Sequence, residues 1–373
     1  MASDKKRILI VFGTRPEAIK MAPLVMAFKA DARFEVKVCV TAQHRQMLDQ
    51  VLAFFDLKPD YDLNLMQPNQ TLYDLSSNIL LGMKKVFAEY IPDYTFVHGD
   101  TTTSTMVALS AFYAKTKVCH VEAGLRTNDK YSPYPEELNR QLTSKIADYH
   151  FAPTDLSKAN LLKEGIPADR IVVTGNTVID ALLIAKEKVE DIVDPEIEGL
   201  KKQIDFSSRI VLVTGHRREN FGEGFENICR AIAKIAEKAN VSVVYPVHLN
   251  PNVQQPVNKL LSNIPNVKLI SPLAYPAFVW LMKRAFLILT DSGGIQEEAP
   301  TLSKPVLVMR ENTERPEALE GNSVFLVGTN VEKIVSVAER FLEAADQPLT
   351  IGRNPFGDGS AATSIVDFIS SQN

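Results

Sequence analysis

The segment 291–298 carries the clearest chemical signal in the sequence, because two adjacent glycines follow an apolar run and precede a helix-forming stretch. The apolar run 286–289 leads into Gly293 and Gly294, whose backbone N–H groups can approach an oxyanion without a side chain in the way. The start of the following helix adds a positive dipole end. Glu298, one turn beyond Gly294, can accept hydrogen bonds from paired sugar hydroxyls. The segment therefore favours a diphosphate joined to a ribose, with a simple capped helix after a strand as the alternative.

A second candidate anion site follows the first predicted strand. Thr14 and Glu17, three positions apart, predict a capping box with a proline early in the helix. Arg15 and Lys20 fall in the first turns of that helix, where cations oppose the helix dipole unless an anion lies nearby. They are either anion ligands or a solvated surface pair.

Two carboxylates follow two further predicted strands. Asp100 comes after the strand 94–97, and Glu122 comes after the strand 117–121. If those strands pair, both carboxylates face one cleft. The structural alternatives are that Asp100 caps the helix beginning near 101 and that Glu122 pairs with Arg126.

A third acidic position opens another predicted helix. Glu136 and Glu137 follow two prolines, and Arg140 lies one turn later. Taken alone, these residues are explained by the helix dipole, which favours acids in the first turn, and by ion pairing between side chains one turn apart.

The segment 215–220 places cationic and titratable groups at the end of another strand, which suits a diphosphate. His216 bound to phosphate oxygens would stay protonated near neutral pH, since an ordinary histidine pKa is about 6.5, and it could neutralise a departing group. A charged helix-capping loop is the alternative. Arg315 and Phe278 could add a guanidinium and an aromatic face.

Strands rich in Val and Ile must position these residues, and they alternate with helical patterns, which predicts parallel sheets. The rhythm restarts after the charged stretch 186–205, so we predict an α/β fold with two doubly wound domains. The expected domains are 1–176 and 177–359, with a C-terminal segment 360–373 packing back on the first. The predicted strands are 8–12, 36–40, 94–97, 117–121 and 171–173, then 210–213, 241–245, 267–270, 286–289, 305–308 and 324–327.

The bulk composition agrees with two well-packed domains. The chain has 373 residues, 45% of them hydrophobic and 23% charged, with a net charge of −4, so nothing draws it toward nucleic acid or an anionic membrane. Its charged N-terminus leads into a short strand, unlike a signal peptide or spanning helix, and we expect a cytoplasmic protein. Cys39, Cys119 and Cys229 are far apart and are predicted to be buried thiols. We expect no metal site.

Two common nucleotide motifs are missing. No strand is followed by Gly-x-Gly-x-x-Gly, and no phosphate loop ends in Gly-Lys-Ser or Gly-Lys-Thr. The sequence therefore gives no sign of NAD binding or of a magnesium-bound triphosphate. A nucleotide held between the two domains is best interpreted as a nucleotide sugar.

Together these motifs closely resemble the bacterial non-hydrolysing UDP-N-acetylglucosamine 2-epimerases, from about residue 7 to 370. The motifs are Gly-Thr-Arg-Pro-Glu-Ala-Ile-Lys at 13–20, His-Gly-Asp-Thr at 98–101, His-Val-Glu-Ala-Gly-Leu-Arg at 120–126, Pro-Glu-Glu at 135–137, Gly-His-Arg-Arg-Glu-Asn at 215–220 and Asp-Ser-Gly-Gly-Ile-Gln-Glu-Glu at 291–298. The resemblance implies the glycosyltransferase-B architecture, two Rossmann-like domains with the active site in the cleft between them. It also implies a homodimer that interconverts UDP-N-acetylglucosamine and UDP-N-acetylmannosamine without cofactor or metal.

The resemblance assigns roles to particular residues. Asp100, Glu122 and Glu136 would surround the sugar as the acid and base set, and His216 with Arg15 would stabilise the leaving group. Phe278 and the backbone at Leu273 would line the uracil pocket. The residues that would hold UDP are Arg15, Lys20, His216, Ser292, Gly293, Gly294, Glu298 and Arg315.

The sequence departs from the family at one position. Some members have a second UDP-sugar site formed by residues matching Gln43, Gln46 and His248, with an arginine where this chain has Asn69. Loss of that cation weakens a phosphate contact, so we predict that substrate activation is absent or altered.

Two other enzymes share many of these features. One is a 2-epimerase acting on a UDP-diacetamido-uronic acid, and the other is a glycosyltransferase with the same fold and UDP seat. Neither the direction of flux, nor the polysaccharide pathway, nor which carboxylate removes and which returns the proton follows from the residues.

Overall fold

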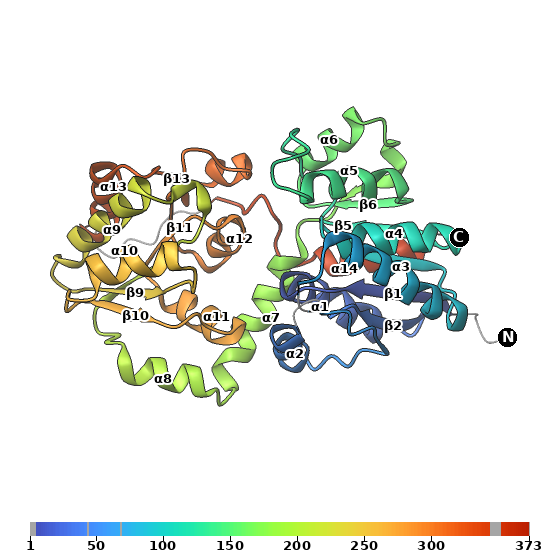
Figure 1. Cartoon of the computed structure of the whole chain (residues 1–373), viewed down its shortest axis with the longest axis horizontal. Helices are drawn as coiled ribbons and strands as arrows, with labels where there is room; N and C mark the ends of the chain where they lie inside the picture. Colours follow the sequence, from blue (N-terminus) through green and yellow to red (C-terminus); the bar gives the residue numbers. More distant parts are fainter. Residues whose placement is uncertain (1–4, 43–44, 68, 344–351, 373) are drawn as a thin grey trace. The chain divides into compact units, whose positions relative to one another are not determined.

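The computed structural model describes residues 5–42, 45–67, 69–343 and 352–372 (Figure 1). The chain forms two compact units, Met1–Leu183 with Phe356–Asn373 and Ile184–Pro355. Each contains a parallel sheet with alternating helices, so the predicted fold class is confirmed. The first unit ends within α7 (Thr177–Asp191), beyond the expected 176, because Asp180 near the start of α7 binds the C-terminal helix.

The N-terminal sheet has the strand order β3-β2-β1-β4-β5-β6-β7, and every pair of neighbours is parallel. The order reverses between β1 and β4, which is where ligands bind in doubly wound folds. Two strands were missing from the sequence prediction: β3, which has two residues, and β6, which has four. The strands are β1 (Lys6–Phe12), β2 (Phe34–Val40), β3 (Tyr61–Asp62), β4 (Tyr94–His98), β5 (Lys117–Val121), β6 (Tyr149–Ala152) and β7 (Ile171–Val173).

Helices cover both faces of this sheet. On one face, α3 and α4 pack over Leu9 and Val11. On the other, Phe28 of α1 lies 5.1 Å from Phe96 between ring centroids, and Phe368 of α14 lies 5.7 Å from Phe151. The helices are α1 (Arg15–Ala30), α2 (Arg45–Phe54), α3 (Leu72–Glu89), α4 (Thr102–Tyr113), α5 (Glu136–Ile146), α6 (Asp155–Lys163) and α14 (Ala361–Ser371), with the 3-10 turn η1 (Ala168–Arg170).

The C-terminal helix α14 is held to the N-terminal unit at both ends (Figure 1). The carboxylate of Asp180 accepts hydrogen bonds from Ala361 N at 3.3 Å and Ala362 N at 2.8 Å. At the other end, Lys6 Nζ donates to Ile369 O at 3.0 Å. An acid at the start of a helix and a base at its end both stabilise the helix dipole.

The C-terminal sheet repeats the arrangement, with the order β10-β9-β8-β11-β12-β13 and a reversal between β8 and β11. Its strands are β8 (Arg209–Thr214), β9 (Val241–Pro246), β10 (Val267–Ile270), β11 (Leu287–Thr290), β12 (Val306–Val308) and β13 (Val324–Leu326). Its helices are α8 (Pro195–Gln203), α9 (Glu223–Ala236), α10 (Pro251–Leu261), α11 (Tyr275–Arg284), α12 (Gly293–Glu298) and α13 (Val331–Glu343), with 3-10 turns η2 (Arg218–Asn220), η3 (Ala299–Leu302) and η4 (Pro316–Gly321).

The core of this unit lies under α9, α10 and α13. Phe225, Ile228, Ile232 and Ile235 recur every three or four residues along α9 and are fully buried. That spacing places them on one face of the helix, against the apolar side chains of the sheet. The well-packed sheet of this unit positions the strand ends that carry candidate site residues such as His216 and Asp291.

Candidate active site

Asp100 and Glu122 follow neighbouring strands. β4 and β5 pair in parallel, with His98 opposite Val121, so the predicted adjacency of the two strand ends is confirmed. The backbone at Glu122 has φ +59°, a left-handed conformation that costs a non-glycine residue roughly 1–3 kcal/mol. Contacts of its side chain with neighbouring residues compensate for this cost.

The carboxylate of Glu122 is almost buried and is held from several sides. Lys20 Nζ donates to Oε2, Asn176 Nδ2 donates to the same oxygen at 2.7 Å, and His98 Nε2 lies 3.7 Å away. Burial lowers the pKa of His98 to about 4, so this imidazole is neutral at pH 7. Lys20 is therefore the charged partner of Glu122. The alternative pairing with Arg126 is wrong, since Arg126 Nε instead lies 2.6 Å from a Glu164 oxygen.

Asp100 is positioned by α5. Arg140 Nε and Nη2 lie 3.0 and 2.7 Å from Asp100 Oδ2, and Asn139 Nδ2 donates to the Asp100 carbonyl at 2.9 Å. The alternative that Asp100 caps α4 is wrong, because the cap is Thr101, whose side chain accepts from Ser104 N at 3.0 Å. Asp100 thus leaves the strand with its side chain directed by a buried guanidinium.

The two glutamates at the start of α5 have different environments. Glu137 is fully buried, pairs with Arg140 at 3.2 Å and accepts from Thr127 N at 3.0 Å. Burial raises the pKa of Glu137, but hydrogen bonds from Thr127, Gln141 and Arg140 together lower it below its ordinary value. Glu136 is half-buried and makes no hydrogen bond or ion pair within the described ranges. The Glu137 carboxylate is therefore engaged within the protein, whereas the Glu136 carboxylate has no partner among the described residues.

Glu17 links the two loops that carry Arg15 and Asp100. The predicted capping box with Thr14 is confirmed. The buried Glu17 carboxylate also accepts from Gly13 N at 3.0 Å and from Thr101 Oγ1 at 2.7 Å. Burial raises the pKa of Glu17, which these hydrogen bonds oppose. Arg15, the first residue of α1, and Lys20 are thus fixed relative to the loop that follows β4 and carries Asp100.

In the C-terminal unit, Asp291 organises the loop after β8. Its fully buried carboxylate accepts from His216 N at 2.9 Å, Arg217 N at 2.8 Å and Asn220 Nδ2 at 3.4 Å. The His216 ring stacks on the ring of His248, with centroids 5.1 Å apart and an interplanar angle of 14°. Burial lowers the pKa of His216, and Asp291 opposes that shift.

Ser292, Gly293 and Gly294 follow β11 and open α12. The Ser292 side chain makes no capping hydrogen bond, so the capped-helix alternative does not explain it. A side chain at Gly293 would meet Arg315, whose Cζ would lie 3.3 Å from the added Cβ. Arg315 itself is fixed by Glu297, with Nε 2.7 Å from Oε1. The guanidinium of Arg315 therefore lies against the backbone of Gly293.

The remaining predicted ligands lie near the same unit's α11. Leu273 precedes this helix and Phe278 lies within it, both half-buried. Glu298, at the end of α12, interacts electrostatically with Tyr275 of α11. Burial and then the charge of Glu298 raise the pKa of Tyr275.

The residues of the predicted second site are only partly described. Gln43 lies outside the described residues, and nothing is described of the Gln46 side chain in α2. His248 Nδ1 accepts from Asn250 N at 3.1 Å while its ring stacks on His216. Asn69 adopts φ +57°.

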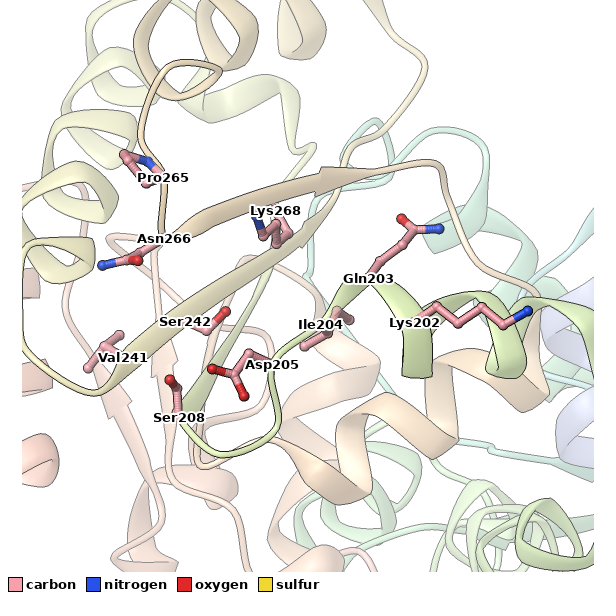
Figure 2. A pocket seen from close by; sticks show the side chains of 10 residues that line it. All are labelled: Lys202, Gln203, Ile204, Asp205, Ser208, Val241, Ser242, Pro265, Asn266 and Lys268. Atoms are coloured by element: carbon pink, nitrogen blue, oxygen red, sulfur yellow. The ribbon is translucent and has the colours of Figure 1, made fainter.

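The cavity in Figure 2 lies at the amino ends of strands of the C-terminal sheet, whereas His216 and Asp291 follow the carboxyl ends. Its volume is about 370 Å³, and Ser208, Val241 and Asn266 line it at the amino ends of β8, β9 and β10. Ligands of doubly wound sheets bind at the carboxyl ends, so this cavity is not the candidate site. Across the described ranges no group of three or more His, Cys, Asp or Glu could hold a metal ion, and no helix is long and apolar enough to span a membrane.

Sequence reasoning missed three residues that build the site: Glu17 as a link between loops, Asn176 as a partner of Glu122, and Asp291 as the anchor of the His216 loop. Glu17 was explained by its cap alone. Asn176 follows the last strand of its sheet, and the carboxyl end of that strand was the signal that could have identified it.

Comparison with known proteins identifies the family. A family model described as UDP-N-acetylglucosamine 2-epimerase matches residues 26–370. Proteins named UDP-N-acetylglucosamine 2-epimerase from Salmonella typhimurium and Escherichia coli K12 are both 56% identical, over 370 and 366 residues, covering 98% and 97% of each chain. The crystal structure of UDP-GlcNAc 2-epimerase from Neisseria meningitidis bound to UDP-GlcNAc has a TM-score of 0.88 and 49% identity, covering 98% of this chain and 100% of that one. The chain belongs to the UDP-N-acetylglucosamine 2-epimerase family.

Proposed function

We propose that this protein catalyses the reversible epimerisation at C2 of UDP-N-acetylglucosamine to UDP-N-acetylmannosamine. The observation that carries the proposal is the placement of Asp100 and Glu122 at paired strand ends, each held by a cation. The relative bound to UDP-GlcNAc, at 49% identity and nearly full coverage, supports this sugar as the substrate.

The chemistry requires that UDP leave before the C2 proton is removed. C2 has no adjacent carbonyl, so a carboxylate cannot take its proton directly at a useful rate. Breaking the bond between C1 and the phosphate oxygen gives an oxocarbenium-like centre, with the electron pair on UDP. The C2 proton then becomes acidic enough for a positioned base, whose help is worth about 100- to 10,000-fold. Loss of that proton gives 2-acetamidoglucal and UDP.

The second half of the reaction reverses these steps on the other face. A proton returns to C2 from the opposite side, and UDP adds again at C1, which inverts the configuration at C2. We propose Asp100, Glu122 and Glu136 as the acid and base set. Glu122 and Asp100 are each fixed by hydrogen bonds, whereas Glu136 makes none with the described residues.

The C-terminal unit would hold the nucleotide. Ser292, Gly293, Gly294 and Arg315 form the proposed diphosphate seat, and the half-buried Phe278 and the backbone at Leu273 the uracil site. Glu298 would accept from the ribose. Each fixed donor that meets developing negative charge on a leaving group is worth on the order of 3 kcal/mol. His216, Arg15 and Lys20 would add positive charge as UDP departs, and no cofactor or metal would be needed.

We also propose that the protein is a homodimer. The helices α3, α4 and α5 pack side by side and expose several large apolar side chains, and a contiguous exposed apolar patch marks an interaction surface on soluble proteins. These are Tyr73, Leu81, Phe112, Tyr113, Leu138 and Leu142. Analytical ultracentrifugation of the wild type and of a Leu81→Glu, Phe112→Glu variant tests this, with a dimer expected only for the wild type. A monomeric wild type would refute it.

The product would supply N-acetylmannosamine units for surface polysaccharide. The test of the activity is NMR of UDP-N-acetylglucosamine with the protein in deuterium oxide. Deuterium at C2 together with UDP-N-acetylmannosamine is expected. A glycosyltransferase would instead require an acceptor, and a parallel assay with a UDP-diacetamido-uronic acid separates the two epimerases. Unchanged substrate without deuterium would contradict the proposal.

A further inference from the structure

Asp291 uses only one of its two carboxylate oxygens to hold the His216 loop. Oδ2 accepts from the backbone N–H groups of His216 and Arg217 and from Asn220 Nδ2. Oδ1 is equally buried and has no hydrogen-bond donor among the described residues. It lies 3.8 Å from His216 Nδ1. A buried carboxylate oxygen without a donor is costly, so a partner for it is expected.

His216 Nδ1 is the group placed to be that partner. The backbone contact fixes the histidine next to Asp291, and a small rotation of the ring brings Nδ1 within hydrogen-bond distance of Oδ1. Such bonds are often long in ligand-free sites and shorten when the ligand binds. The His248 ring covers one face of the His216 ring at 5.1 Å, which restricts how the imidazole can tilt.

We propose that Asp291 is a positioning residue that holds the proton of His216 on Nδ1 and so presents Nε2 to the leaving diphosphate. This inference rests on the proposed role of His216 in the epimerisation. The arrangement follows the logic of the aspartate in a serine protease triad, which fixes the tautomer of its histidine and stabilises the imidazolium. Here the imidazolium would donate from Nε2 to the phosphate oxygen that gains charge as the C1–O bond breaks.

The charged groups around His216 allow it to become an imidazolium when the diphosphate binds. Asp291, from the end of β11, favours the imidazolium, while His248 and Arg217, from the loops after β9 and β8, disfavour it. His248 Nδ1 accepts a backbone N–H from Asn250 at 3.1 Å in the same geometry. His216 can therefore gain its charge when the diphosphate arrives.

The direct test is the tautomer of His216 in the ligand-free wild-type protein. Long-range ¹H–¹⁵N spectra with ¹⁵N-histidine labelling distinguish a protonated ring nitrogen from an unprotonated one, and the His216→Gln variant assigns the signals. We expect Nδ1 protonated and Nε2 unprotonated in neutral His216. The reverse pattern in the wild type would overturn the proposal without any variant.

Asp291→Asn then tests the cause. The asparagine oxygen can still accept from the His216 and Arg217 backbone, while its NH₂ group faces Nδ1 and forces the proton to Nε2. The expected result is a reversed tautomer, a pKa of His216 shifted to lower pH, and a kcat lower by on the order of 100-fold or more with little change in KM. An unchanged tautomer in this variant would also overturn the proposal.

Asp180→Asn is the matched control. Asp180 is likewise buried and accepts two backbone N–H groups, from Ala361 and Ala362, but no histidine of the described ranges is its partner. We expect it to lower stability while leaving the His216 tautomer and the pH profile of kcat unchanged. Because the tautomer is read without substrate, a protein that shows the expected tautomer but does not epimerise would contradict the proposed function and not the role of Asp291.

Discussion

Arg140 Nη2 lies 2.7 Å from Asp100 Oδ2, and the same guanidinium bonds Glu137 through Nη1 at 3.2 Å. Arg140 therefore connects the end of β4 to the first turn of α5, which carries Glu136. Two of the three proposed acid and base residues thus depend on one nearly buried guanidinium.

Arg140→Lys is expected to lower kcat by about 100-fold with a small effect on KM, because a lysine cannot contact both carboxylates and a shift of about 1 Å in a catalytic group costs that much. Steady-state epimerisation kinetics measure it. Arg126→Lys is the control, since Arg126 is another arginine with a buried side chain, and its carboxylate partner is Glu164 rather than Asp100. Equal losses of kcat in the two variants would count against a special role for Arg140.

Asn176→Ala should lower kcat about 10- to 100-fold, since a hydrogen bond to a charged group is worth about 1.5–3 kcal/mol and this one holds Glu122 at 2.7 Å. The same assay provides the measurement. Asn160→Ala removes a comparable side-chain bond, from Asn160 Nδ2 to Gly124 O at 3.0 Å, and is expected to leave kcat near the wild type. A wild-type kcat for Asn176→Ala would show that Glu122 needs no such partner.

His150 makes the protein less stable in acid. Burial lowers its pKa to about 3, so the native state keeps the imidazole neutral while the unfolded chain binds a proton below about pH 6.5. Its contribution to stability is fully present above pH 6.5 and is lost as the pH falls toward 3. As the pH is lowered from 6 to 4, the free energy of unfolding of His150→Leu should therefore rise relative to that of the wild type by about 1.4 kcal/mol for each pH unit.

Urea unfolding of both proteins at several pH values and one fixed protein concentration measures this difference. His98 and His120, whose pKa values burial lowers to about 4 and about 3, are present in both proteins, and their effects largely cancel. Parallel curves of unfolding free energy against pH would contradict the prediction.

The presence of Asn69 leads to a prediction about how the epimerisation rate depends on substrate concentration. The family resemblance implies a second UDP-sugar site with an arginine at this position in some members, so the wild-type rate should rise hyperbolically with UDP-N-acetylglucosamine concentration. Asn69→Arg should restore substrate activation, and Asn69→Gln, without a charge, should not. A clearly sigmoidal wild-type curve would contradict the prediction.

The sequence was sufficient for the fold because Val- and Ile-rich runs alternate with helical patterns. It was insufficient for β6, where His150 interrupts the apolar pattern of a four-residue strand, and for β3, which has two residues. Such short elements are defined by their neighbours in the sheet, which a local pattern does not contain.

The candidate site was predicted where residues follow strands directly, as Asp100 and Glu122 do, since paired parallel strands bring their ends together. The buried state of Cys39, Cys119 and Cys229 was also predicted correctly. Partners far apart along the chain were not predictable. Lys20 reaches Glu122, and Arg140 reaches Asp100, only because tertiary packing brings these groups together.

The most direct test of the central claim uses UDP-N-acetylglucosamine carrying ¹⁸O in the bridge between the sugar and the β-phosphate, incubated with the protein in deuterium oxide. If UDP leaves before the C2 proton is removed, ³¹P NMR will show ¹⁸O moving to non-bridging positions of the β-phosphate as deuterium enters C2. Accumulation of C2-deuterated UDP-N-acetylmannosamine with all of the ¹⁸O still in the bridge would contradict the account.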